Sequence, residues 1–113
     1  MIFYWKSTCS TCRDARDVVL ELQPAIEQRN YAKEPLTETE VLALVKAAGS
    51  VAAVLNARHA IAKEKGWKEH PPGVAEYAKA VASENNLIRR PITVRNGKAV
   101  VGFVRDELQS LLK

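Results

Sequence analysis

The sequence predicts an α/β domain with a small mixed β-sheet, and three observations indicate this fold class. A strand–helix–strand unit opens the chain, several helices follow it, and a β-hairpin with a last helix closes it. The 113 residues suit one domain spanning residues 1–113, which is long enough to bury its own core. Hydrophobic residues make up 47% and charged residues 27% of the chain, as in ordinary globular proteins.

The opening unit is an apolar run followed by a helical pattern. Residues 2–5, Ile-Phe-Tyr-Trp, are aromatic or branched and predict a short buried strand. From Arg13 onward, apolar residues recur with the period of a helix up to Leu22. Pro24 interrupts that pattern, and the more polar residues 26–31 predict a second strand that is short or lies at a sheet edge.

The middle of the chain predicts helices only. Thr37 and Glu40 have the spacing of a capping box, so a helix is expected to begin there and to end at Gly49. Ser50 can cap a further helix over residues 51–55. The rest of this region comprises a helical stretch towards Gly66, a loop over 67–73 and a helix over 74–82.

The end of the chain predicts a hairpin and a helix. Asn96-Gly97 separates the apolar runs 91–95 and 98–103, and both turn positions tolerate the positive φ that two-residue hairpins require. A helix over 105–112 follows. This order of elements describes a thioredoxin-like fold in which the helices between the second strand and the hairpin form an insertion.

Cys9 and Cys12 are the only cysteines, and they lie three residues apart where the first strand leads into the first helix. A thiol at that turn faces unpaired backbone N–H groups and the positive end of the helix dipole, and both favour the thiolate. A second thiol one turn away can resolve the bond that the first one forms. The pair therefore predicts thiol chemistry, either redox or nucleophilic.

Three structural explanations of the pair stay open beside that one. Both residues could be small buried side chains, although inert core cysteines rarely fall together at a strand–helix turn. They could supply half of a zinc site, but the only other soft ligands, His59 and His70, lack the usual close spacing. They could also form a static disulfide, but so short a loop constrains the unfolded chain little.

Composition argues against two classes of partner. The formal net charge is +4, but the basic residues are scattered and aromatic residues are few, so direct nucleic-acid binding is not expected. No apolar run approaches the roughly 20 residues of a membrane span, so no membrane partner is expected either. From Met1 the chain enters a predicted strand without a secretory signal, which favours a reducing cytoplasm and transient disulfides.

Several motifs fall at the spacing of a known family. They are Tyr4–Arg13 with the C-x-x-C pair, Lys33–Thr37, Leu55–Arg58, Leu87–Ile92 with R-R-P-I, and Val100–Phe103 followed by Asp106. C-x-x-C alone is a weak signal, but R-R-P-I before a hairpin at this distance makes the combination specific. Over nearly its whole length the chain resembles the arsenate reductase-like ArsC/Spx family of thioredoxin-fold proteins.

The resemblance implies a set of catalytic residues. Cys9 matches the family's nucleophilic cysteine, and Arg90 matches an arginine beside the active site, so the Arg90–Pro91 bond is expected to be cis. The planar donor fork of arginine suits a thiolate and a tetrahedral oxyanion. Arg58 lies in the segment where arsenate-reducing members carry another active-site arginine, while a gap-free alignment places Asn56 at that position.

Two departures from the family pattern bear on the substrate. Gly102 stands where a third arginine is expected, and loss of one such donor should weaken arsenate binding by about 1–3 kcal/mol. Cys12 is an additional thiol, since many arsenate-reducing members keep only the first cysteine.

The resemblance thus implies a small cytoplasmic thiol oxidoreductase. Cys9 would attack arsenate or a disulfide, Arg58 and Arg90 would stabilise charge, and Cys12 or glutathione would resolve the adduct. No metal or bound cofactor is implied, while glutathione is expected as thiol co-substrate, with glutaredoxin as an alternative reductant.

The alternative is a redox-sensing regulator of the Spx type, which acts on RNA polymerase. Both cysteines are present in that branch, and their disulfide would serve as a switch. The region around Gly49 would then contact the polymerase α subunit, although a helix C-cap explains this glycine equally well. The chain also lacks the longer charged tail of those regulators, so we favour the enzyme.

Overall fold

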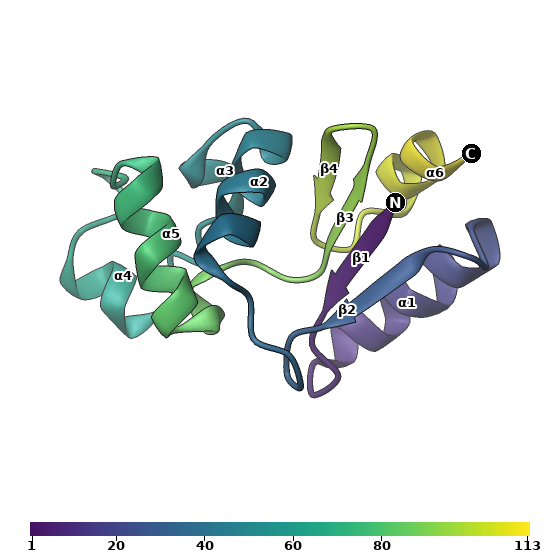
Figure 1. Ribbon diagram of the computed structural model, residues 1–113, viewed down its shortest axis with the longest axis horizontal. Coiled ribbons are helices and arrows are strands. Elements are labelled where there is room, and N and C mark those ends of the chain that lie inside the picture. Colours follow the sequence, from purple (N-terminus) through teal and green to yellow (C-terminus); the bar gives the residue numbers. More distant parts are fainter. The chain divides into compact units, whose positions relative to one another are not determined.

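The computed structural model describes residues 1–113, which divide into two compact units (Figure 1). The sheet unit comprises Met1–Glu34 and Arg90–Lys113, and the helical unit comprises Pro35–Arg89. The helical unit is the insertion predicted between the second strand and the hairpin. The single domain expected from the length of the chain stays a prediction.

The sheet unit confirms the predicted α/β class and its mixed sheet. Its elements are β1 (Ile2–Trp5), α1 (Ser10–Leu22), β2 (Glu27–Asn30), β3 (Ile92–Arg95), β4 (Lys98–Val101) and α6 (Arg105–Leu112). The strand order is β2-β1-β3-β4, with β1 parallel to β2 and antiparallel to β3. The polar strand β2 lies at one edge of the sheet, as its sequence predicted.

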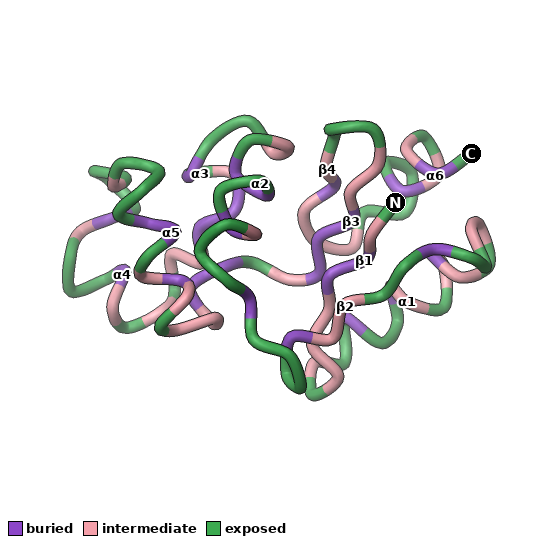
Figure 2. The backbone as a smooth tube through the Cα atoms, in the orientation of Figure 1, coloured by how far each residue is buried: buried purple, intermediate pink, exposed green.

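One face of the sheet carries the core of this unit. Phe3, Thr93 and Val100 lie opposite one another in register on β1, β3 and β4, so their side chains share that face. Phe3 and Thr93 are fully buried, and Figure 2 shows buried stretches on β1 and β3. Further buried members of the same core are Ala15, Val19, Ile26, Leu108 and Leu112, mostly from α1 and α6. This packing fixes α1, and with it the turn that precedes the helix, against the central strand β1.

The hairpin between β3 and β4 forms as predicted. Asn96 and Gly97 have φ of 53° and 74°, which are the positive values expected of a two-residue turn. Strand β4 ends at Val101, two residues before the predicted end at 103. It ends there because Gly102 takes a φ of 87°, outside the range of a strand, although its N–H still donates to the Pro91 carbonyl at 2.7 Å.

The helical unit begins with the predicted capping box. Thr37 Oγ1 accepts the Glu40 N–H at 3.2 Å, and Glu40 Oε1 accepts the Thr37 N–H at 3.0 Å. Gly49 ends the first helix of this unit, α2, with a φ of 101°. The elements of this unit are α2 (Glu38–Ala48), α3 (Val51–Val54), α4 (Ala60–Glu64), α5 (Val74–Ser83) and the 3₁₀ turn η1 (Asn85–Leu87).

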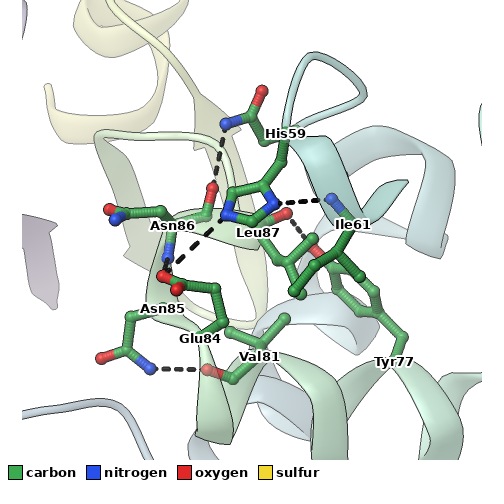
Figure 3. Close-up of polar contacts among 9 residues, drawn as sticks. His59, Ile61, Tyr77, Val81, Glu84, Asn85, Asn86 and Leu87 are labelled. Carbon is green, nitrogen blue, oxygen red and sulfur yellow. Dashed lines mark hydrogen bonds and ion pairs between the residues drawn. The ribbon is translucent and has the colours of Figure 1, made fainter. Parts of the chain in front are cut away.

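A network of hydrogen bonds ties η1 to the segment after α3 (Figure 3). The buried Tyr77 hydroxyl donates to the Leu87 carbonyl at 2.9 Å, and the Val54 carbonyl lies 3.3 Å away. Asn56 Nδ2 donates to the Asn86 carbonyl at 2.9 Å. Tyr77 is thus a buried tyrosine whose hydroxyl is fully paired. None of the helices in either unit has the length and apolar composition needed to cross a membrane.

Candidate thiol site

Three segments of the sheet unit bring functional side chains to one edge of the sheet. The carboxyl end of β1 leads into the loop that carries Cys9, Tyr31 directly follows β2, and Arg90 lies just before β3. Because β1 and β2 are parallel and β3 is antiparallel, these three chain segments meet at the same edge (Figure 1). The Tyr31 N–H donates to the Trp5 carbonyl at 3.0 Å, which fixes Tyr31 beside the end of β1.

The loop before α1 is held by hydrogen bonds from both sides. Cys9 N–H donates to the Lys6 carbonyl at 3.0 Å, and Ser7 N–H donates to Asn30 Oδ1 at 3.2 Å. Arg13 Nη1 donates to the Ser7 carbonyl at 2.9 Å. Cys9 is the N-cap residue of α1, so its sulfur lies at the helix N-terminus where the sequence placed it.

The surroundings of Cys9 favour its thiolate. Burial acts against ionisation, but the backbone N–H and side chain of Cys12 and the guanidinium of Arg90 outweigh it, and the pKa of Cys9 is lowered. Cys9 is partly exposed, so its sulfur can be reached by a substrate. A lowered thiol pKa together with access is the combination that reactive cysteines require.

Cys12 has the opposite properties. Its side chain is fully buried, and that burial, together with the neighbouring Cys9 sulfur, raises the pKa of Cys12 to about 11, although the Lys6 backbone N–H acts against the shift. Both cysteines are free thiols in this structure. The two members of the C-x-x-C pair are therefore chemically distinct: Cys9 is accessible and shifted towards the thiolate, whereas Cys12 is shielded and protonated.

Arg90 supplies the positive charge of the site. The Arg90–Pro91 peptide bond is cis, which confirms the expectation from the resemblance. Burial would lower the pKa of Arg90, but a hydrogen bond with Cys9 and the charges of Tyr31, Cys9 and Cys12 raise it above its ordinary value. The guanidinium therefore stays charged beside the Cys9 sulfur.

Tyr31 also belongs to this cluster, although its sequence predicted only the last residue of a strand. It is 4% exposed, and burial raises the pKa of its hydroxyl above the ordinary range although Arg90 acts against that shift. Its place in the sequence could have indicated this, because Tyr31 directly follows a strand that is adjacent and parallel to β1. Side chains at that point reach the same sheet edge as the Cys9 loop.

Arg58, the remaining predicted site residue, belongs to the helical unit. It is exposed, and its N–H donates to Asn56 Oδ1 at 3.3 Å. Arg58 also lines an open pocket of about 360 Å³, together with Lys63 and Lys68. Its predicted catalytic role stays a prediction.

The surroundings of His59 bear on the alternative in which the two cysteines form half of a zinc site. His59 is not inside a helix but is the N-cap of α4, where Nδ1 accepts the Ile61 N–H at 3.1 Å (Figure 3). Its Nε2 lies 4.0 Å from a Glu84 carboxylate oxygen. No three His, Cys, Asp or Glu side chains come together as a metal site would need.

The different pKa values of the two thiols predict different alkylation profiles. Because the thiolate is the reactive form and the pKa of Cys9 is lowered, Cys9 should react with iodoacetamide at pH values below the ordinary thiol pKa of 9.0. With a pKa of about 11, Cys12 carries its thiolate in roughly one molecule in 10⁴ near neutral pH, so it should stay unmodified. Peptide mass spectrometry after timed alkylation measures both rates.

Protein unfolded in urea is the control for this experiment, since both thiols should then react alike. Fast alkylation of Cys12 in the folded protein near neutral pH would contradict the assignment of the two thiols.

The fold and this edge of the sheet define a thioredoxin-like protein with an arginine-assisted thiol site. The sequence model of the ArsC family matches residues 4–111, and the chain belongs to the ArsC family.

Known proteins similar to the chain carry different names. It is 30% identical over 112 residues to the uncharacterized protein YusI of Bacillus subtilis strain 168, covering 96% of this chain and 95% of YusI. It is 25% identical over 113 residues to the global transcriptional regulator Spx of Enterococcus faecalis, covering 99% of this chain and 86% of that protein.

Solved structures confirm the fold. An arsenate reductase from Vibrio cholerae superposes with a TM-score of 0.81 at 25% identity, covering 98% of this chain and 96% of that one. The protein YFFB (PA3664) also gives a TM-score of 0.81, at 20% identity, covering 99% of this chain and 98% of that one. Among these similar proteins, one is thus named a reductase and another a transcriptional regulator.

Proposed function

We propose that the protein is a thiol oxidoreductase in which Cys9 is the nucleophile. One observation carries the proposal: of two adjacent thiols, only Cys9 is both accessible and shifted towards the thiolate, and Arg90 contributes to that shift. A regulatory disulfide alone does not require such a difference between the thiols, whereas an attacking thiolate does. The cytoplasmic location expected from the sequence belongs to this proposal.

With a disulfide as substrate, the Cys9 thiolate attacks one sulfur, and the other sulfur leaves as a thiolate. The product is a mixed disulfide on Cys9. A glutathione thiolate then attacks this mixed disulfide at the sulfur of the bound group, which releases Cys9 as the thiolate and leaves the group joined to glutathione. A second glutathione thiolate attacks the glutathione sulfur of that product, which releases the group as a thiolate and forms oxidised glutathione. Two thiols of glutathione are oxidised for each disulfide reduced, so electrons balance.

With arsenate as substrate, Cys9 would displace one oxygen from arsenic, and that oxygen leaves as water. Overall, two thiols become one disulfide while arsenic(V) is reduced to arsenic(III). Arg90 is the charged donor for the oxyanion in this step. Arg58 would be a second donor, as the family resemblance implies.

External thiols are the better resolving agents because Cys12 is shielded. Attack by Cys12 first requires removal of a proton from a buried thiol whose pKa is about 11. Glutathione in solution meets no such barrier, since its thiol is solvated. We therefore assign turnover to Cys9 and external thiol, with the Cys9–Cys12 disulfide as a slower side product.

Adduct trapping tests this function. Cys12→Ser protein treated with oxidised glutathione should carry one glutathione on Cys9, seen by mass spectrometry of the intact protein and its peptides. Excess reduced glutathione should remove the adduct. Cys9→Ser is the matched control and should form no adduct on Cys12, because Cys12 is fully buried.

A regulator of the Spx type is the second candidate, because a relative of that name aligns over 99% of this chain. If the parent protein passes directly to a Cys9–Cys12 disulfide that glutathione does not reduce, the enzyme proposal fails and the regulator is favoured. The RNA polymerase α subunit would then be the partner to examine.

A further inference from the structure

Two buried polar atoms beside Cys9 have no hydrogen-bond partner in the protein. They are Tyr31 Oη and Arg90 Nε. Buried polar groups in native proteins are almost always paired, and an unpaired one costs free energy. The other two such atoms, Trp5 Nε1 and Thr93 Oγ1, belong to residues on the helix-covered face of the sheet. Of the four residues with such an unpaired atom, only Tyr31 and Arg90 lie beside the Cys9 thiol.

These two groups are neighbours of each other and of the reactive sulfur. Arg90 affects the pKa of both Cys9 and Tyr31, and the Cys9 charge in turn affects Tyr31. Yet neither Oη nor Nε completes a hydrogen bond with the other. The Tyr31 hydroxyl keeps its proton because burial disfavours the phenolate, so it is available as a donor.

We propose that Tyr31 Oη–H and Arg90 Nε–H together donate hydrogen bonds to an oxygen atom of the group that becomes bonded to Cys9. This inference rests on the proposed function and adds Tyr31 to its catalytic residues. A small outward shift of the partly exposed Arg90 side chain gives that oxygen its room. A disulfide has no oxygen at the attacked atom, so Tyr31 serves oxyanion substrates and contributes nothing to disulfide reduction.

The chain offers a matched control in Tyr77. Both tyrosines are buried, but the Tyr77 hydroxyl is paired with the Leu87 carbonyl at 2.9 Å, whereas the Tyr31 hydroxyl is unpaired. Tyr77→Phe should therefore lower the melting temperature and leave anion binding unchanged. Tyr31→Phe should keep or raise the melting temperature, because it removes an unpaired buried hydroxyl.

The test measures protection of Cys9 from iodoacetamide by arsenate, and separately by phosphate, without any reductant. This readout gives the affinity for the anion and does not depend on turnover. We expect Tyr31→Phe to weaken anion binding by about tenfold, the loss of one hydrogen bond to a charged group. The Tyr77→Phe control should match the parent in its alkylation profile without anion and in its reaction with oxidised glutathione.

Three outcomes overturn the proposal. The parent shows no protection by either anion, or Tyr31→Phe binds the anions as tightly as the parent, or Tyr31→Phe changes the alkylation profile of Cys9. The last result would mean that Tyr31 acts only by positioning Arg90. A protein that binds anions through Tyr31 but shows no glutathione adduct on Cys9 would refute the proposed function and leave this inference standing.

Discussion

Replacing Cys9 by serine should lower glutathione-dependent reduction of arsenate and of disulfides by about 10³-fold or more, as loss of a catalytic nucleophile does. A serine hydroxyl is not ionised near neutral pH, so the attacking group is lost. The fold should be retained, because Cys9 is an N-cap residue that makes no capping hydrogen bond, and serine is among the best N-cap residues. The measurement is kcat/KM with glutathione as the reductant, coupled to NADPH oxidation by glutathione reductase.

Cys12→Ser is the matched control for this substitution. It removes a sulfur of the same pair but leaves the nucleophile and the external reductant, so most turnover should persist. The prediction is wrong if Cys9→Ser protein with a native circular dichroism spectrum reduces either substrate at the parental rate. If Cys12→Ser lost turnover as fully as Cys9→Ser, the internal disulfide would be an obligatory intermediate.

Much of the fold could be predicted because its boundaries are set by local chemistry. The capping box of Thr37 and Glu40, the αL residue Gly49 and the Asn96-Gly97 turn act over a few residues, and all three are observed. The edge position of β2 followed from its polar side chains. The turn η1 was not predicted, because three residues capped by the Glu84 side chain give no periodic apolar pattern.

The candidate site was predictable in its position and in its general kind of chemistry, but not in the difference between its two thiols. A C-x-x-C pair at a strand–helix turn indicated thiol chemistry, and its place at the N-terminus of α1 is observed. The difference between the two thiols depends on how α1 packs on the sheet, which buries Cys12 and leaves Cys9 partly exposed. That packing involves residues far apart in the chain, and Tyr31 joins the site for the same reason.

The site also shows how stability and function are opposed at this sheet edge. Unpaired donors at Tyr31 and Arg90 and a buried thiol at Cys12 each cost folding free energy. The paired tyrosine of the helical unit, Tyr77, shows that this chain can satisfy a buried hydroxyl. Groups that lower the stability of the fold are often concentrated at functional sites, and here they surround the accessible thiol of Cys9.

Arg90→Gln should lower kcat/KM for arsenate by about 10–100-fold, the loss expected for a hydrogen bond to a charged group. Arg90 lowers the pKa of Cys9, so its removal raises that pKa and leaves less thiolate near neutral pH. Alkylation of Cys9 should therefore be slower in the variant at low pH. The difference should shrink as the pH rises above the ordinary thiol value of 9.0, because Cys9 is then ionised in both proteins.

Two matched variants separate the charge of Arg90 from its shape. Arg89→Gln makes the same change in net charge at the adjacent, exposed arginine and should leave the alkylation profile of Cys9 unchanged. Arg90→Lys keeps the positive charge but lacks the planar fork, so it should restore much of the thiolate without restoring arsenate affinity. An alkylation profile of Arg90→Gln that superimposes on that of the parent would show that the guanidinium does not stabilise the thiolate. Cys9 would then owe its reactivity to its place at the N-terminus of α1 and to its hydrogen bonds with Cys12.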